Sequence, residues 1–229
     1  MTSRLTLSVS TEAQSSPAVL HFLREVVDDF VRAMSLGFFG PGVLEVQVSV
    51  QPASRTIVHI HVDGEAVNPA AVRVLRGMCE WEGRADGLPL RWLGAVGQGI
   101  EAPPSGNAPA LAASGSPPGF LLARPAYLGF GEPFVVVLEF SAPADDAQIA
   151  LIESGLATWT ALLRGGLPPD DGMPGESDVG ATAGTRIGST TYQWFVEAAV
   201  VDAACIDLLV RFLEAHSLAL RLTSVTFEA

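Results

Sequence analysis

One order of secondary-structure elements is predicted twice along the chain, and this repeat constrains the fold more than any other feature. In residues 1–96, a strand pattern at 4–10 is followed by a helical pattern, two strand patterns, a second helical pattern and a final strand. Residues 133–229 repeat the same β-α-β-β-α-β order. Recurrence of one order of elements indicates an internal duplication.

Turn and cap residues predict where the elements of the first copy begin and end. Ser16 and Pro17 suit a helix start and Gly37 suits its end, since proline is favoured in a first turn and glycine just beyond a last one. The later elements of this copy are a hairpin, a helix and a strand, predicted at 43–50 with 56–63, from Asn68-Pro69, and at 88–96.

The sequence of the second copy predicts the same elements, with a longer irregular insertion among them. Asp145 and Asp146 open a helix that runs to Arg164. The remaining elements are predicted as a strand at 134–141, an irregular loop at 167–185, strand residues within 186–201, a helix from Asp202 and a final strand at 218–228.

Individual residues of the two copies also match. A shift of 129 positions places Leu23, Val27 and Phe30 of the first helix on Ile152, Leu156 and Trp159. A shift of 130 positions places Leu88, Leu90 and Arg91 on Leu218, Leu220 and Arg221. These agreements in apolar size and identity support the duplication.

The β-α-β-β-α-β order predicts an α+β fold made of two ferredoxin-like units, at 1–96 and 133–229. Right-handed crossovers place both helices of such a unit on one face of its antiparallel sheet and leave the other face open. Residues 97–132 read as a Pro/Gly/Ala-rich linker whose apolar end packs on a domain. This fold hosts many unrelated activities and assigns none.

The acidic charge excludes some partners and favours others. The chain has 25 acidic residues, 13 Arg and no Lys, a net charge of −12, which argues against binding to nucleic acid or an anionic membrane. Residues 133–229 carry 13 acidic residues and 4 Arg, so most of the negative charge lies in the second copy. This imbalance favours a basic protein partner.

The lack of membrane-spanning and signal-peptide patterns and the two expected thiols favour a cytoplasmic protein. The sequence has no apolar run long enough to cross a membrane and no signal-peptide pattern at its start. Cys79 and Cys205 lie in helical patterns and are expected to be buried, reduced thiols.

The open face of the first sheet carries the first candidate site. Strand alternation places His59 and His61 on this face, with Glu45 and Gln47 on the neighbouring strand. The imidazoles can bind a ligand, act as acid and base, or share a metal with Glu45. The same pattern also fits an ordinary solvated sheet face. Because no third ligand has a recognisable spacing, the sequence assigns no metal ion and no cofactor.

The sheet of the second copy has apolar residues on both faces, which predicts a cover on each. The second cover is expected to be the first copy, the apolar end of the linker, or another chain in a homodimer. Trp194 and Glu197, with Glu139 and Gln193, are candidates for a ligand pocket on this sheet, or they end their strands in solvent.

The irregular stretch of the second copy contains an acidic cluster whose members are Asp170, Asp171, Glu176 and Asp178. Their spacing is not that of an EF-hand loop, so no Ca²⁺ site is assigned. They are expected to form an acidic interaction loop.

These observations favour a non-enzymatic, cytoplasmic protein-binding module, of the kind in which an immunity or antitoxin protein binds a basic partner. No GxSxG, HExxH, P-loop or CxxC motif occurs, and no catalytic residue is assigned. The alternatives are an enzyme or a small-molecule or metal binder that uses His59, His61 and Glu45, and a structural oligomer subunit.

Overall fold

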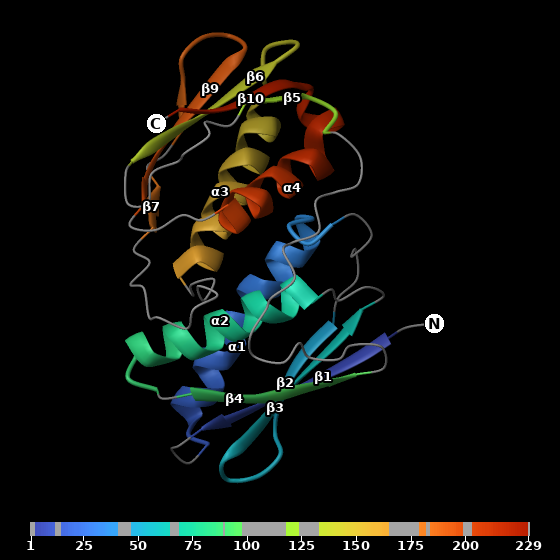
Figure 1. The fold of residues 1–229 in the computed structure, drawn as a ribbon, viewed down its shortest axis with the longest axis vertical. Coiled ribbons are helices and arrows are strands. Elements are labelled where there is room, and N and C mark those ends of the chain that lie inside the picture. Colours follow the sequence, from blue (N-terminus) through green and yellow to red (C-terminus); the bar gives the residue numbers. More distant parts are fainter. Residues whose placement is uncertain are drawn as a thin grey trace. The chain divides into compact units, whose positions relative to one another are not determined.

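The first four strands pair in the order β2-β3-β1-β4, and every pair is antiparallel. In the computed structural model, the elements are β1 (Ser3–Thr11), α1 (Pro17–Ser35), β2 (Gln47–Pro52), β3 (Ile57–Gly64), α2 (Pro69–Ala85) and β4 (Leu90–Gly97). Both helices lie on one face of the sheet (Figure 1). This arrangement is the predicted ferredoxin-like fold.

The structure describes ten segments of the chain, which are residues 3–11, 15–40, 47–64, 69–88, 90–97, 118–123, 133–164, 179–181, 184–198 and 203–228. The described elements divide into two compact units, with β1–β4, α1 and α2 in the first and, apart from the last residue of α3, all later elements in the second. No helix in these segments is long and apolar enough to cross a membrane.

The second unit repeats the topology of the first. Its elements are β5 (Leu121–Ala123), β6 (Phe134–Phe140), α3 (Asp146–Arg164), β7 (Val179–Ala181), β8 (Thr185–Arg186), β9 (Thr191–Ala198), α4 (Ala203–Leu220) and β10 (Leu222–Glu228). The strands pair in the order β5-β10-β6-β9-β7, and β8 also pairs with β9. Figure 1 shows α3 and α4 on one face of this sheet. The prediction of two ferredoxin-like units is confirmed.

Part of the predicted linker belongs to the second sheet. Leu121–Ala123 forms β5, which pairs in parallel with β10 and extends the sheet at that edge. Phe120, next to it, is 6% exposed. The rest of 97–132 lies outside the described residues, except for 97 and 118–119.

The first helix of each unit confirms the residue-level repeat. α1 and α3 both have 19 residues and begin 129 positions apart. Phe30 and the matching Trp159 are fully buried, as are Leu23 and Ile152. One amphipathic pattern therefore builds the same half of the core in both units.

The predicted caps are also present. The side chain of Ser16 accepts a hydrogen bond from the backbone N–H of Val19 at 3.2 Å, and Pro17 opens α1. At α3, Asp145 and Gln148 exchange hydrogen bonds between each side chain and the other residue's backbone N–H, which is a capping box. Both arrangements satisfy donors that a helix start leaves without an intrahelical acceptor.

The match of Leu88, Leu90 and Arg91 to Leu218, Leu220 and Arg221 is wrong. Leu90 lies in β4, whereas Leu220 is the last residue of α4. Arg221 adopts a left-handed backbone conformation with φ of 57° and separates α4 from β10. Apolar residues at every second position fit a strand and also the last turn of a helix. The pattern alone therefore does not decide whether such residues belong to a helix or to a strand.

The prediction of an irregular stretch over 167–185 is corrected at its end, where β7 and β8 pair with β9. The backbone N–H of Gly184, between these short strands, donates to Oε1 of Glu153 at 3.0 Å. The hydroxyl of Tyr192 also hydrogen-bonds Glu153. Strands of three and two residues are too short to show a periodic pattern in the sequence. The strands β7 and β8 therefore depend on contacts with α3 and β9.

Close packing joins the helices of the second unit. A Cβ at Gly155 of α3 would lie 2.1 Å from the ring of Phe212 on α4, so a glycine is needed for this approach. The indole N–H of Trp159 donates to the backbone carbonyl of Cys205 at 2.8 Å and adds a hydrogen bond between the same helices.

Gly155→Ala is therefore expected to destabilise the second unit by about 1–3 kcal/mol, because an added methyl group overpacks a filled core. Gly188→Ala is a matched control, since nothing lies within 4 Å of a Cβ built at Gly188. Urea unfolding monitored by circular dichroism measures both variants. Equal stability of Gly155→Ala and the wild-type protein would contradict the packing described for α3 and α4.

Candidate functional site

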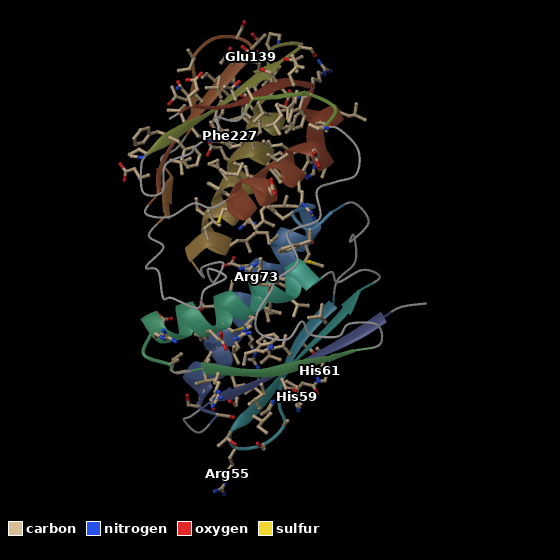
Figure 2. The ribbon with its side chains drawn as sticks, viewed as in Figure 1. Arg55, His59, His61, Arg73, Glu139 and Phe227 are labelled. Atoms are coloured by element: carbon tan, nitrogen blue, oxygen red, sulfur yellow. The ribbon has the colours of Figure 1, made fainter. Side chains whose placement is uncertain are left out.

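The open face of the first sheet carries a cluster of hydroxyl and imidazole groups. Val58, Ile60 and Val62 of β3 are fully buried, so the alternate residues His59 and His61 lie on the opposite face. Figure 2 shows both histidines on the side of the sheet away from α1 and α2. Their cross-strand neighbours carry hydroxyl or amide groups and are Ser8, Thr6, Ser49 and Gln51.

Two side-chain contacts organise this cluster, which we call the imidazole face. Oγ of Ser8 lies 2.9 Å from Nδ1 of His59, within hydrogen-bond distance. The rings of His59 and His61 stack with their centroids 5.9 Å apart and their planes at 29°. Both histidines are half-buried, so their side chains are partly packed and partly open to solvent.

A bulge in β4 leaves space beside Ser8. The pairing of β1 with β4 shifts between Ser8 and Val9, and Gly94 lies opposite Ser8. Gly94 has φ of 152°, and nothing lies within 4 Å of a Cβ built on it. The backbone N–H of Trp92, next to the bulge, donates to Oε1 of Glu80 at 3.0 Å. The helix-borne carboxylate therefore supports the bulged strand beside the imidazole face.

The described residues contain part of the site predicted from the sequence. His59 and His61 lie together as expected, and Gln47 pairs in register with Asp63. Glu45 lies outside the described residues. Within the described part of the chain, no group of three or more His, Cys, Asp or Glu residues could hold a metal ion.

Ser8 is a site residue that the sequence reasoning missed. The alternation in RLTLSVS places Thr6, Ser8 and Ser10 on one face of β1, and this pattern could have identified Ser8 as a residue of the open face. Its pairing with His59, 51 positions further along the chain, depends on strand order and register.

The open face of the second sheet has an apolar centre. Val135, Val137 and Phe195 lie on it, because Val136, Leu138 and the other alternate residues of these strands face the helices and are buried. Phe195 is 41% exposed and Leu121 on β5 is 78% exposed. The described residues of the second unit leave this face partly exposed, and the predicted cover by the first copy, the end of the linker or another chain stays a prediction.

Carboxylates lie at both ends of the apolar centre. Glu139 lies on the outer side of the sheet (Figure 2), and its Oε2 accepts a hydrogen bond from Oγ of Ser224 at 2.6 Å. Toward the other end, Glu228 pairs with Val135, and Glu197 lies two positions beyond Phe195. These three glutamates are exposed. We call the apolar centre and these glutamates the acidic-apolar face.

Trp194 and Glu197 do not lie on the same side of β9. Trp194 is fully buried on the helix-covered side, where its ring meets that of Tyr192 edge-on at 5.7 Å between centroids. Glu197 lies on the open side, as do Gln193 and Glu139 by strand alternation. The two residues therefore do not line a common pocket, and the role of Trp194 is in the core.

The other predicted features are the acidic cluster and the two cysteines. The acidic cluster of Asp170, Asp171, Glu176 and Asp178 lies outside the described residues. Cys79 and Cys205 are buried thiols that form no disulfide, as expected.

Asp29 on α1 has a perturbed carboxyl group but does not form a site. Burial raises the pKa of Asp29, Arg32 lowers it, and Asp28 and Glu25 raise it further. All three neighbours lie on the same helix, and α1 covers the face of the first sheet opposite the imidazole face. A shifted pKa of this local origin does not identify a functional residue.

Comparisons with known proteins assign no family. No protein-family model and no curated protein matches the sequence. Among solved structures, an unknown protein from Galdieria sulphuraria is 9% identical, with 100% of this chain and 98% of that chain covered and a TM-score of 0.23. A microcompartment protein from Desulfitobacterium hafniense DCB is 15% identical, with 100% and 94% covered and a TM-score of 0.24. Similarities this low carry no argument about function.

The two sides of β9 are expected to respond differently to truncation. Trp194→Ala removes a fully buried ring and should cost about 3–5 kcal/mol of the free energy of unfolding. Phe195→Ala removes a ring that is 41% exposed and should cost about 1 kcal/mol or less. Urea unfolding of both variants gives the comparison. A larger loss for Phe195→Ala than for Trp194→Ala would show that the two faces are assigned the wrong way round.

Proposed function

We propose that this protein is a non-enzymatic, cytoplasmic protein-binding module that binds a basic partner through the acidic-apolar face. The observation that carries the proposal is the pairing of a partly exposed apolar centre with exposed carboxylates on one open sheet face. Apolar side chains at the centre of an interface contribute affinity, and charges around them select the partner and speed its approach.

The distribution of charge supports the choice of a basic partner. Residues 133–229 carry 13 acidic residues against 4 Arg, whereas residues 1–96 carry 10 acidic residues against 8 Arg. Glu139, Glu197 and Glu228 bring part of this excess to the same face as Phe195. An immunity-like or antitoxin-like role, in which the module neutralises a basic protein, is the concrete form of this proposal.

The cysteines are consistent with this role, whereas the exposed apolar side chains also bear on an alternative. Cys79 and Cys205 are buried and form no disulfide, which suits a reducing compartment. The exposed side chains of Leu121 and Phe195 also suit a homodimer, in which a second copy covers the acidic-apolar face. Charge disfavours that arrangement, because two copies would bring like carboxylates together.

A photocrosslinking residue in place of Phe195 is expected to capture a basic protein in cells of the native host, because this position lies at the centre of the proposed interface. The same residue in place of Leu93, an exposed side chain of the first unit, is the positional control. The captured protein is then purified, and its affinity is measured by calorimetry.

Charge reversal tests the same interface with the purified partner. Glu197→Arg with Glu228→Arg should weaken binding at least about tenfold, since it replaces attraction by repulsion, and added salt should weaken wild-type binding. Asp28→Arg with Asp86→Arg changes net charge equally at exposed positions of the first unit and should leave binding unchanged. A crosslink to a second copy alone, or equal effects of the two double variants, would overturn the proposal.

A second candidate function is binding of a small molecule or metal ion, or catalysis, at the imidazole face. The hydrogen-bond contact between Ser8 and His59, and the space beside Gly94, favour it. A hydroxyl beside an imidazole can orient the ring and select its tautomer, which prepares the other ring nitrogen for a ligand or proton.

A further inference from the structure

We propose that His59 and His61 bind a late first-row transition ion, with highest affinity for Cu²⁺. The inference deepens the second candidate function and does not depend on the protein-binding proposal. Imidazole nitrogens are suited to copper, nickel and zinc. The histidines lie two positions apart on β3, so both side chains project from the same face of one strand.

The distance between the rings suits chelation. Their centroids are 5.9 Å apart. Because a metal–imidazole nitrogen bond is about 2.1 Å long, two imidazoles on one ion keep their centroids no more than about 6.4 Å apart. The ring centroids of His59 and His61 already lie within this limit.

Ser8 is a positioning residue for this site. When Nδ1–H of His59 donates to Oγ of Ser8, across the observed 2.9 Å, the lone pair of the neutral ring lies on Nε2. Histidines that ligate metals usually donate their other ring N–H to a neighbouring acceptor, which fixes both tautomer and orientation. Ser8 provides this acceptor on the adjacent strand.

The number of protein ligands selects the ion. Two imidazoles leave several coordination positions to water, and tetragonal sites of nitrogen and oxygen ligands suit Cu²⁺ and Ni²⁺. Zinc sites usually take three or four protein ligands, more than the described residues bring together here. Affinity should therefore fall from Cu²⁺ to Ni²⁺, and Mg²⁺ should not bind, because it prefers oxygen ligands.

Calorimetric titration of the full-length protein with Cu²⁺, Ni²⁺ and Mg²⁺ tests the site, at about pH 7.5, where an ordinary imidazole is neutral. We expect one equivalent of Cu²⁺ to bind and its affinity to fall at least about tenfold in His59→Ala and in His61→Ala. His21→Ala on α1 is the matched control and should bind like wild type, because His21 lies outside the imidazole face. Circular dichroism verifies that each variant is folded.

Ser8 is tested by a readout that a purely structural role would not change. In the metal-free protein, ¹⁵N chemical shifts should show His59 protonated on Nδ1, and Ser8→Ala should raise the population of the other tautomer and weaken Cu²⁺ binding roughly tenfold. Ser8→Thr keeps the hydroxyl group and should restore both properties. No Cu²⁺ binding, or binding that His59→Ala and His61→Ala leave unchanged, would overturn the proposal.

Discussion

The register between the two central strands of each sheet determines which side of every strand is buried. In the first unit, Leu7 of β1 pairs with Ile60 of β3, and in the second, Val136 of β6 pairs with Trp194 of β9. A slip of one residue would exchange the buried and open faces, since side chains alternate along a strand. The helices can cover one face, so this register also defines the surfaces available for function.

The two units use one topology to present different chemistry. The first displays hydroxyl and imidazole groups, among which Ser8 and His59 are in contact. The second displays an apolar centre around Phe195, with carboxylates at both ends. Because each unit builds its own core from equivalent helix and strand positions, the open faces have been free to diverge after duplication. This difference is consistent with ligand binding by one unit and protein binding by the other.

The sequence predicted features that depend on local patterns. The start of α1 at Ser16 and Pro17, the start of α3 after Asp145 and the position of His59 and His61 on one face all follow from neighbouring residues. The element order then gave the ferredoxin-like topology, because right-handed crossovers leave few alternatives.

Features that depend on distant contacts were missed or misplaced. The contact between Ser8 and His59 joins residues 51 positions apart, and β7 and β8 are strands because β9 pairs with them. The pattern at Leu218 and Leu220 was assigned to a strand, although it ends a helix, because alternation over so few residues does not distinguish the two. Trp194 was placed with Glu197, although they lie three positions apart on β9 and strand alternation puts them on opposite faces.

Methyl-group relaxation with a soluble paramagnetic probe tests most directly whether the second sheet has one buried and one open face. The probe reaches only exposed methyl groups, and β6 provides its own internal comparison without mutation. We predict strong relaxation enhancement at Val135 and Val137 and protection at Val136 and Leu138, which are fully buried. Equal protection of all four residues would contradict an open acidic-apolar face.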